Sequence, residues 1–395
     1  MKRQYLRDIA DIQTGPFGSQ LHKEDYVDVG TPIVTVEHLG NRIFTEQNLP
    51  RVSDEDKMRL SKYVLAEGDM VFSRVGSVDR CSYVDAAHDG WMFSGRCLRV
   101  RPNSEIDPLF LYYFFCLEET KQFVRNIAVG ATMPSINTKL LGEVEVIYPS
   151  LTDQQKIVAM LSALDNRIEV NQRINDNLEQ QARAYFQELF VDNADPEWTT
   201  GTISDLGAVV GGSTPSKAKP EYYTESGIAW ITPKDLSINK SKFISHGEND
   251  ITELGLRNSS AAIMPEGTVL FSSRAPIGYI AIAAGEVTTN QGFKSVVPKP
   301  EIGTPFVYFF LQHNLPVIEG MASGSTFKEV SGSTMKNIPA VIPDAETLAR
   351  FNDFCTSIFA QQRILENQSQ LLAALRDILL PKLMSGELDV STIQL

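Results

Sequence analysis

The sequence has few of the residues that bind transition metals. It contains 4 cysteines and 5 histidines in 395 residues. Cys81, Cys97, Cys116 and Cys355 form no Cys-x-x-Cys pair, and no two histidines have the spacing of a ligand pair, so a zinc site is not expected. We interpret the four cysteines as buried or unreactive thiols.

Long apolar runs are also absent. No segment resembles a membrane-spanning helix, and Met1-Lys2-Arg3 is followed by no apolar core of the kind found in export signals. We therefore expect neither membrane insertion nor export, but a cytoplasmic chain.

Positive charge is scarce, with 36 Lys or Arg against 49 Asp or Glu and a net charge of −13. This balance argues against tight, independent binding to DNA, because phosphate contacts need Lys and Arg. The acid is densest in residues 151–197, which hold nine Asp or Glu against four Lys or Arg. A local basic stretch remains in the first part of the chain: Arg74, Arg80, Arg96, Arg99 and Arg101. Any DNA contact is therefore expected to need a more basic partner.

What the chain does have is self-similarity, with one copy in about residues 1–189 and another in about residues 199–383. The matches include Gly15 with Gly212, 197 positions later, Ser94-Gly95 with Gln291-Gly292, Thr132 with Thr326, and Pro149 with Pro343, 194 positions later. A duplication of this length indicates two copies of a domain rather than a solenoid. Two similar domains suit a target with two halves, such as duplex DNA.

The copies divide the chain into four predicted segments: a first recognition domain (1–150), a central long helix and linker (151–197), a second recognition domain (198–344), and a C-terminal long helix and tail (345–395). Short β-rich runs punctuated by Gly and Pro predict strands at 32–36, 70–73, 98–101, 144–148, 229–232, 269–272, 295–297 and 340–342. Helices are expected over 108–126 and 305–315. The predicted fold class is α+β, with two similar mixed α/β domains.

Two further stretches predict long helices. Thr152-x-x-Gln155 is a capping box that predicts the start of the first. Apolar residues then recur at steps of three and four: Ile157, Leu161, Leu164, Ile168, Leu178, Ala182, Tyr185 and Leu189, and in the second copy Leu348, Phe351, Cys355, Ile358, Leu365, Leu372, Leu379 and Leu383. Asn171 and Asn175 lie on the first stripe, where they fix the register of the helices or contact a partner. Pro381 is expected to end or kink the second helix.

Because each helix carries one narrow stripe, we expect the two to pair as an antiparallel coiled coil that separates the domains with pseudo-twofold symmetry. A rod of roughly 60 Å would reach separate DNA half-sites ~34 Å apart. The alternative is that each helix only covers its own domain, but a 3.5-residue repeat over more than four heptads favours pairing. The copies differ most over 42–64 and 237–261, where loops that read different DNA sequences are expected.

The copies also share an order of motifs. These are Gly15-Pro16-Phe17-Gly18-Ser19 and Gly212-Ser213-Thr214-Pro215-Ser216, then Phe72-Ser73-Arg74-x-Gly76 and Ser273-Arg274-Ala275-Pro276-Ile277-Gly278, then Thr289-Asn290-Gln291-Gly292, and a final Leu-Leu-Pro-Lys-Leu-Met-x-Gly-Glu at 379–387. This order resembles the target recognition domains of type I restriction-modification specificity subunits, over essentially the whole chain. One departure is Asp79, where the family often has Gly, as at Gly278.

The resemblance implies a non-catalytic subunit that binds a bipartite target in double-stranded DNA with an unread spacer. Such a subunit scaffolds two adenine methyltransferase (M) subunits and, through them, restriction and translocase (R) subunits. Its helices set the spacer length and dock these partners. The chain itself is expected to need no cofactor, because S-adenosylmethionine and ATP with Mg²⁺ bind to the partner subunits.

The residues expected to contact DNA are Arg74, Arg80, Arg96, Asn137 and Lys139 in the first domain, and Arg274, Lys294, Lys328 and Lys336 in the second. Arg and Lys suit phosphates or guanine edges, and Asn suits adenine or the backbone. For any one of them, a solvated surface charge is the simpler interpretation.

Three motifs with catalytic overtones are interpreted as chance. Asp107-Pro108-Leu109-Phe110 lacks the second Pro of an adenine methyltransferase motif, and Glu119-x-Lys121 lies on an expected helix where a nuclease motif would have strands. In residues 211–217, Pro215 removes an amide that a phosphate loop would need. The alternatives to DNA readout are an enzyme, or a coiled-coil interaction scaffold without DNA readout.

Overall fold

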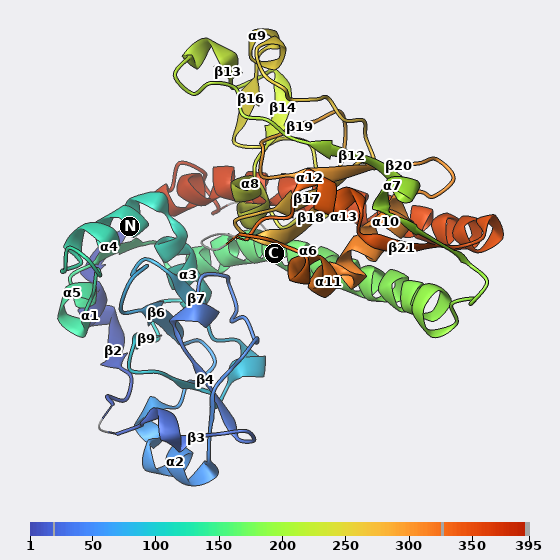
Figure 1. Ribbon diagram of the computed structural model, residues 1–395. Helices are drawn as coiled ribbons and strands as arrows, with labels where there is room; N and C mark the ends of the chain where they lie inside the picture. The colour runs from blue at the N-terminus through green and yellow to red at the C-terminus, as the bar shows by residue number, and fades with distance from the viewer. Residues whose placement is uncertain (19, 325–327, 392–395) are drawn as a thin grey trace. The chain divides into compact units, whose positions relative to one another are not determined.

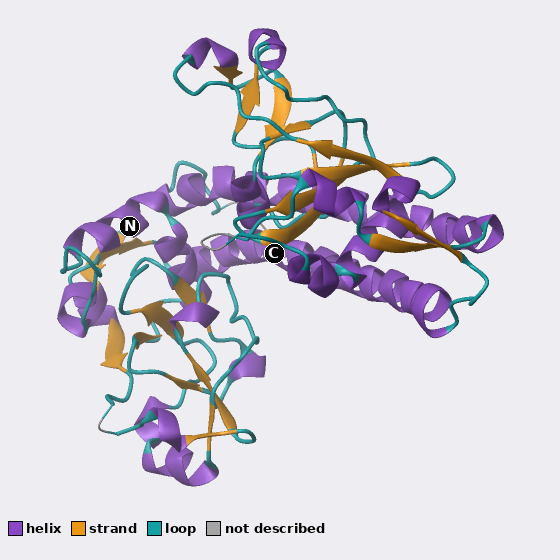
Figure 2. Cartoon of the chain, in the orientation of Figure 1, coloured by secondary structure: helices purple, strands orange, loops and turns teal. Residues whose placement is uncertain are grey.

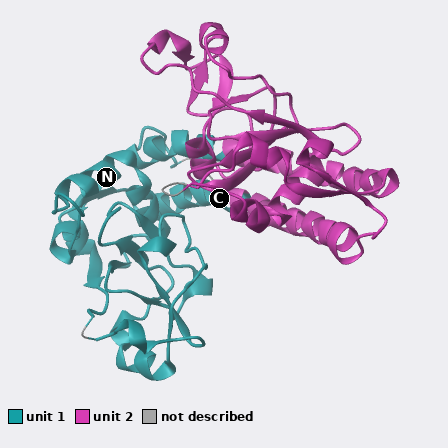
Figure 3. Cartoon of the chain, viewed as in Figure 1, with its two compact units in different colours: residues 1–167, 372–395 teal, residues 168–371 magenta. Residues whose placement is uncertain are grey.

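The computed structural model describes residues 1–18, 20–324 and 328–391 (Figure 1), so the matches proposed at Ser19 and Thr326 lie outside the described residues. The chain divides into two compact units (Figure 3). Unit 1 comprises Met1–Arg167 and the chain from Leu372 onward, and unit 2 comprises Ile168–Leu371. Each unit therefore includes part of both long helices, α6 (Leu151–Gln187) and α13 (Ala345–Ser385), together with one α/β part.

Unit 1 contains a two-stranded ribbon and two four-stranded sheets. The ribbon pairs β1 (Lys2–Tyr5) with β10 (Glu145–Tyr148). The central sheet has the order β2 (Ala10–Thr14), β9 (Cys97–Pro102), β6 (Met70–Ser73), β7 (Cys81–Tyr83). The distal sheet has the order β3 (Tyr26–Val27), β5 (Arg51–Val52), β4 (Thr31–Val34), β8 (Met92–Phe93), with β4 and β8 parallel.

Unit 2 repeats this strand order, which confirms the duplication. Its ribbon pairs β11 (Thr199–Thr202) with β21 (Pro339–Ile342). Its central sheet runs β12 (Gly207–Gly211), β20 (Lys294–Pro298), β17 (Val269–Ser273), β18 (Ile277–Ala283), and adds β15 (Phe243–Ile244) at the edge. Its distal sheet runs β13 (Tyr223–Thr224), β16 (Asn249–Ile251), β14 (Ile228–Ile231), β19 (Thr288–Thr289). Figure 2 shows the strands gathered in the α/β part of each unit.

Short helices cover these sheets. Unit 1 has α1 (Leu6–Ile9), α2 (Asp54–Arg59), α3 (Pro108–Cys116), α4 (Glu118–Ile127) and α5 (Thr138–Gly142). Unit 2 has α7 (Ile203–Leu206), α8 (Pro233–Ile238), α9 (Glu253–Arg257), α10 (Thr304–His313), α11 (Leu315–Gly320) and α12 (Gly332–Lys336).

The single helix expected over 108–126 is two helices. Leu117 adopts an extended conformation, with φ −58° and ψ 133°, and separates α3 from α4. The two segments have different environments: Phe110–Phe115 of α3 are all buried, whereas α4 buries only Thr120 and Val124. One continuous helix could not present both a fully buried and a one-sided surface without this break. Likewise, the helix expected over 305–315 ends at His313 and α11 follows.

Each unit has two hydrophobic cores. In unit 1, one core joins α3 and the central sheet to the long helices, through Ile157, Leu161 and Leu383 among others, and a second core fills the distal sheet around Val34 and Phe93. Unit 2 has the same two-part arrangement. The long helices therefore cover the domains and also pair with each other. Both interpretations of their apolar stripes, pairing and covering a domain, are correct.

Within each unit, α6 and α13 pack antiparallel. In unit 1, Arg376 Nη1 donates to Asp165 Oδ1 at 2.8 Å, and Lys156 Nζ donates to the backbone oxygen of Ser391 at 2.8 Å. In unit 2, Asn171 Nδ2 donates to Gln368 Oε1 at 3.0 Å, and residues earlier in α13 meet residues later in α6. The paired helices expected from the stripes are confirmed.

The ends of the long helices differ from expectation. α6 begins at Leu151, and its capping residue is Ser150, whose hydroxyl accepts from the Asp153 amide at 3.3 Å and donates to the Asp153 carboxylate at 2.7 Å. The capping box expected at Thr152 is therefore wrong by two positions. The Ser150 hydroxyl makes the capping hydrogen bonds instead. Pro381 lies inside α13, which continues to Ser385.

Three of the four cysteines, Cys81, Cys97 and Cys355, are buried, and Cys116 is partly buried. Burial raises the pKa of the Cys97 and Cys355 thiols to about 12, so both are protonated and poorly nucleophilic at neutral pH. In the described part of the chain, no helix is both long enough and apolar enough to cross a membrane.

Candidate nucleic-acid interface

The expected DNA-contacting residues of unit 1 cluster where four loops meet at one end of the central sheet. The Arg74 amide, just beyond β6, donates to the Arg96 carbonyl at 2.9 Å, and the Ile136 amide donates to the Arg74 carbonyl at 2.9 Å. The Gly15 amide, just beyond β2, donates to the Cys97 carbonyl at 3.2 Å. Backbone hydrogen bonds thus hold together segments that are far apart in the sequence.

Unit 2 builds the same cluster from the same kinds of bond. The Ser273 amide donates to the Gly292 carbonyl at 2.7 Å, and the Val330 amide donates to the Ser273 carbonyl at 2.9 Å. Ser273 is therefore the backbone equivalent of Arg74. The side chain of Arg274 leaves the chain one residue later.

The same bonds correct the sequence match between Ser94-Gly95 and Gln291-Gly292. The Ser94 amide donates to Val34, and its structural counterpart, the Asn290 amide, donates to Ile231. Asn290 and Gln291 are therefore the counterparts of Ser94 and Gly95. The chain from the bonded residue of the distal sheet to this turn is therefore one residue shorter in unit 2, because 94 − 34 is 60 whereas 290 − 231 is 59.

Glycine is required where the first loop crosses the turn before β9. A Cβ on Gly15 would lie 2.1 Å from the Ser94 carbonyl oxygen, and a Cβ on Gly95 would lie 2.2 Å from the Pro16 oxygen. In unit 2, a Cβ on Gly212 would lie 2.0 Å from the Asn290 oxygen. This close backbone contact explains why both copies have Gly at the start of the first motif.

The cations of unit 1 lie on the exposed side of this cluster. Arg74 is half-buried: its guanidinium donates to the Gly95 carbonyl at 2.9 Å and lies 5.7 Å from the ring centroid of Phe17. Arg80 and Arg96 are exposed on the adjoining loops. The structure therefore brings all three arginines to one set of loops, and leaves their charges accessible to a ligand.

Asn137 and Lys139 follow directly after the last loop of the cluster. The Asn137 side-chain oxygen caps α5 by accepting from the Leu140 amide at 2.9 Å. Helix capping therefore accounts for Asn at this position without any contact to DNA, because a capping Asn satisfies an otherwise orphaned helix amide. The Lys139 side chain is exposed on α5.

In unit 2, the expected cations surround an acidic residue that sequence reasoning missed. Glu329 lies 3.4 Å from Arg274 Nη1 and 3.7 Å from Lys294 Nζ. Lys294 is also largely covered, with 15% of its side chain exposed, and donates to the Gln291 carbonyl at 3.3 Å. Ser135 takes the place of Glu329 in unit 1, so the two clusters differ in charge.

The remaining candidates in unit 2 are Lys328 and Lys336. Both are exposed, Lys328 beside Glu329 and Lys336 in the last turn of α12. The contacts described for Lys336 involve its backbone, whose carbonyl accepts from the Ser204 hydroxyl at 3.1 Å.

The local basic stretch of the first domain is not one surface. Arg99 is buried and pairs with Asp11, and Arg101 forms two 2.6 Å hydrogen bonds to the buried Asp69. These two arginines lie on β9 and pair within the sheet, so of the local basic stretch only Arg74, Arg80 and Arg96 lie at the loop cluster. Arg99 and Arg101 are two residues apart on β9 and therefore share one face of the sheet, whereas Arg96 lies in the turn before the strand.

The departure at Asp79 also has a structural explanation. The Asp79 carboxylate accepts from Arg125 Nη1 at 2.6 Å, which ties the β6–β7 loop to α4. The positive φ in this loop belongs to Gly76, at +75°, whereas in unit 2 it belongs to Ala275 and Gly278, at +51° and +94°. The two loops therefore turn differently.

The chance interpretation of the catalytic motifs agrees with their contacts. The Asp107 carboxylate caps α3, accepting from the Leu109 and Phe110 amides at 2.9 and 3.1 Å. In the loop 211–217, carbonyl groups accept from side chains: Trp230 donates to Ser213 at 3.0 Å and Tyr223 to Pro215 at 2.6 Å. This arrangement differs from that of a phosphate-binding loop, in which backbone amides converge on the phosphate.

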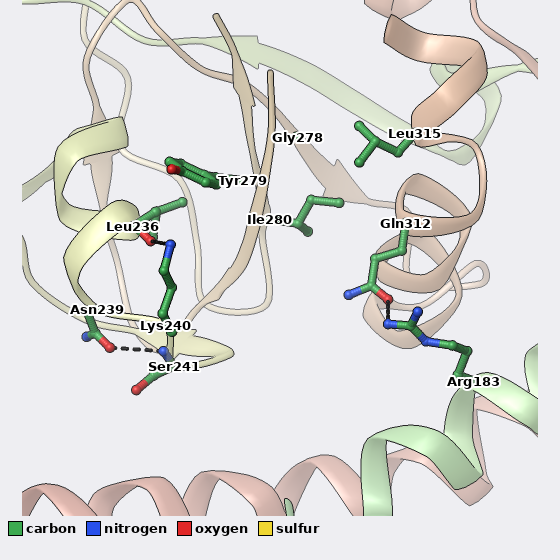
Figure 4. A pocket seen from close by; sticks show the side chains of 10 residues that line it. All are labelled: Arg183, Leu236, Asn239, Lys240, Ser241, Gly278, Tyr279, Ile280, Gln312 and Leu315. Carbon is green, nitrogen blue, oxygen red and sulfur yellow. Dashed lines mark hydrogen bonds between the residues drawn. The ribbon is translucent and has the colours of Figure 1, made fainter. Parts of the chain in front are cut away.

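A separate pocket of about 330 Å³ lies in unit 2 beside α8, β18 and α10 (Figure 4). Its two cations are already engaged: Arg183 donates to Gln312 Oε1 at 2.9 Å and Lys240 to the Leu236 carbonyl at 3.3 Å. The pocket contains none of the expected DNA-contacting residues.

Comparison with known proteins places this geometry in a family. A family model of the type I restriction modification DNA specificity domain matches residues 2–180 and 196–380. The type I restriction enzyme MjaIX specificity subunit of Methanocaldococcus jannaschii is 38% identical over 190 residues, a match that covers 46% of this chain and only 44% of that protein. The HindI specificity subunit of Haemophilus influenzae is 24% identical over 407 residues, covering 83% of this chain and 88% of that protein.

A solved structure agrees on the fold. The type I restriction-modification S subunit from M. genitalium superposes with a TM-score of 0.56 at 18% identity, covering 97% of this chain and 95% of that one. The two family matches coincide with the two copies of the strand order and of the loop cluster. The chain therefore belongs to the type I restriction modification DNA specificity domain family and carries two copies of that domain.

Proposed function

We propose that this chain is the non-catalytic DNA sequence-specificity subunit of a type I restriction-modification complex. It binds a bipartite target in double-stranded DNA, with one half-site for each domain and an unread spacer between them. The observation that carries this proposal is the duplicated loop cluster, in which equivalent backbone bonds present cations at the same end of both central sheets.

The cations divide into two kinds of contact. The exposed Arg80 and Arg96 suit phosphates, which position a protein on DNA, and Arg74 and Arg274 at the strand ends suit guanine edges. Lys328 and Lys336 supply phosphate contacts in unit 2, and Asn137, Lys139 and Lys294 complete the proposed set. The distal sheets, with the divergent stretches 42–64 and 237–261, provide the rest of the readout.

The long helices provide the contacts to other subunits. Two adenine methyltransferase (M) subunits dock on them, and restriction and translocase (R) subunits join through the M subunits. S-adenosylmethionine and ATP with Mg²⁺ bind to these partners, and the assembly works in the cytoplasm. The net charge of −13 supports the need for such partners, because DNA affinity depends largely on Lys and Arg.

Co-expression with an adenine methyltransferase, followed by mapping of methylated adenines in genomic DNA, tests the proposal. A two-part motif that disappears without this chain is expected. A continuous motif, or a motif independent of this chain, would contradict it. Complex formation with no dependence of methylation on this chain would instead favour the alternative, a coiled-coil interaction scaffold without DNA readout.

Arg274→Ala in the assembled complex tests the site itself. We expect weaker binding to the mapped target and relaxed choice at the base that Arg274 contacts, with the salt slope largely unchanged because no phosphate contact is lost. Lys299→Ala is the matched control. Lys294 is the first residue of β20, whereas Lys299 follows the last residue, at the opposite end of the strand. Unchanged affinity and unchanged sequence choice for Arg274→Ala would remove this residue from the interface.

A further inference from the structure

Phe17 is a large aromatic side chain held in an exposed position beside the cations of unit 1. It is 55% exposed. Single exposed apolar residues are ordinary on protein surfaces, so exposure alone says little. What distinguishes Phe17 is its place directly after a close backbone crossing and beside the Arg74 guanidinium.

Backbone contacts shape the loop that carries Phe17. The Phe17 carbonyl accepts from the Gln20 and Leu21 amides at 2.8 and 3.2 Å. Just before it, the crossing of Gly15 and Gly95 leaves no room even for a Cβ atom. The Phe17 ring emerges directly after this close crossing, beside the Arg74 guanidinium.

The hairpin attached to the Arg74 loop also carries exposed apolar side chains. Arg74 lies over the Phe17 ring, and the hairpin that packs against it carries Val129 and Met133, which are 55% and 65% exposed. The Gly76 amide donates to the Pro134 carbonyl at 2.8 Å, which attaches this hairpin to the Arg74 loop. An exposed ring therefore lies against the Arg74 guanidinium, on the loops that also carry the exposed Arg96.

Among the described residues, unit 2 has a different kind of side chain at the position equivalent to Phe17. The residue 197 positions after Phe17 is Thr214, and its hydroxyl donates to the side chain of Gln291. A threonine already bonded within the protein offers neither a ring face nor a wedge. The two domains therefore differ in chemistry at matching places, as expected if they contact different bases.

We propose that Phe17 is a base-contacting wedge, inserted against a base step of the half-site that unit 1 binds. The inference rests on the proposed function, since it requires that unit 1 binds DNA. Arginine attracts the phosphates, and the apolar side chain gains by partly unstacking the bases, as wedge residues of DNA-bending proteins do. Flexible pyrimidine–purine steps deform most easily, so the half-site is expected to contain one.

The experiment uses the complex with its methyltransferase, and duplexes carrying the mapped target. One duplex carries 2-aminopurine in the half-site of unit 1, away from the methylated adenine, so that its fluorescence reports unstacking. The variants are Phe17→Ala and Phe17→Tyr, which keeps the ring. Phe123→Ala is the matched control, because Phe123 is 43% exposed on α4 of the same unit.

Phe17→Ala should weaken target binding by about 5- to 100-fold, the range for loss of one base–aromatic contact. The fluorescence increase should fall, and the salt slope should stay unchanged because no phosphate contact is lost. Phe17→Tyr should retain most of the affinity, and Phe123→Ala all of it.

Wild-type affinity and fluorescence for Phe17→Ala would overturn the wedge. A loss shared equally by target and scrambled duplexes, with a lower salt slope, would also overturn it, because that pattern indicates phosphate binding. Failure of the wild-type complex to distinguish its mapped target from a scrambled duplex would instead refute the proposed function. The two failures are therefore distinguishable.

Discussion

Lys242 places its ammonium group 4.1 Å from the ring centroid of Phe359, in the core that joins the central sheet of unit 2 to α13. The lysine is buried, donates to Gln362 Oε1 at 2.6 Å and pairs with Glu179 of α6. Burial lowers the pKa of Lys242, although Glu179 opposes the shift. One side chain thus connects the sheet to both long helices.

Unit 1 makes the same connection with different groups. The Tyr113 hydroxyl of α3 donates to Asp165 Oδ2 of α6 at 2.6 Å, and Arg376 of α13 bonds to the other oxygen of that carboxylate at 2.8 Å. In both units a buried ionic group specifies how the helix pair meets the domain. Directional polar contacts of this kind favour one orientation, whereas apolar packing tolerates several.

Lys242→Met should destabilise unit 2 by about 3 kcal/mol, the lower end for a broken buried ion pair, because the Glu179 carboxylate that loses its cation is only partly buried, with 21% of its side chain exposed. Denaturant unfolding of the purified chain measures the change. Lys240→Met is the control, since Lys240 is exposed two residues earlier. Adding Glu179→Gln to Lys242→Met should restore part of the loss; equal stability of wild type and Lys242→Met would show that the buried pair contributes nothing.

Glu366 predicts a pH dependence with a definite sign. Burial raises its pKa, although the Lys242 and Phe243 amides donate to its carboxylate at 2.8 and 3.1 Å. The folded state therefore binds the proton more tightly than the unfolded state, so this group's stabilisation is present at low pH and is lost as pH rises from the usual glutamate range through the raised pKa.

Unfolding free energies measured across mildly acidic pH test this sign. Compared with wild type, Glu366→Gln should lack that fall in stability with rising pH. Glu346→Gln, on an exposed position of the same helix, should keep the wild-type profile. A wild-type profile for Glu366→Gln would mean that Glu366 does not titrate in this range.

The strands that the sequence analysis predicted lie close to their observed bounds, but others, among them β2 and β18, were not predicted. Residues 70–73 form β6 as expected, because a short apolar run between turn residues has few alternatives to a buried strand. The paired helices followed from their long stripe. The break at Leu117 was missed because Leu has no helix-breaking signal; the change from a fully buried to a one-sided environment appears only in the tertiary structure.

The candidate site was less predictable, because its residues meet through long-range contacts. Arg99 and Arg96 looked alike in the sequence, yet one pairs with Asp11 inside the sheet and the other is exposed in a turn. Glu329 had no motif to mark it, since its effect depends on the fold bringing Arg274 to it from a distant loop. Charge type can be read from a sequence, but charge neutralisation requires the structure.

Asn171 should limit the stability of the helix pair while specifying its register. It is fully buried, and its Oδ1 has no hydrogen-bond partner among the described residues, although its Nδ2 donates to Gln368 and Ser369. Asn171→Leu should raise the free energy of unfolding by about 1 kcal/mol, since it removes an unsatisfied polar atom.

The same variant should make the register less unique, because a buried Asn selects one alignment of paired helices. Hydrogen exchange along α6 should then become heterogeneous. Asn177→Leu, on an exposed position of α6, should change neither property. Lower stability for Asn171→Leu would show that the bonds to Gln368 and Ser369 outweigh the unsatisfied oxygen.

Glu329 should weaken the attraction of unit 2 for DNA backbone, because its carboxylate lies within 4 Å of both Arg274 and Lys294. Glu329→Gln removes that negative charge while keeping the side chain's shape. The complex should then bind scrambled duplex more tightly, and the salt slope should steepen by about 0.9 for each additional phosphate contact. Discrimination between target and scrambled DNA should fall, because the gain is independent of sequence.

Glu301→Gln, which changes an exposed acid elsewhere in unit 2, controls for the change in net charge. If the two variants bound scrambled DNA equally, net charge alone would explain the effect. If Glu329→Gln instead lost target affinity, the carboxylate would be a direct base contact, accepting from a cytosine amino group.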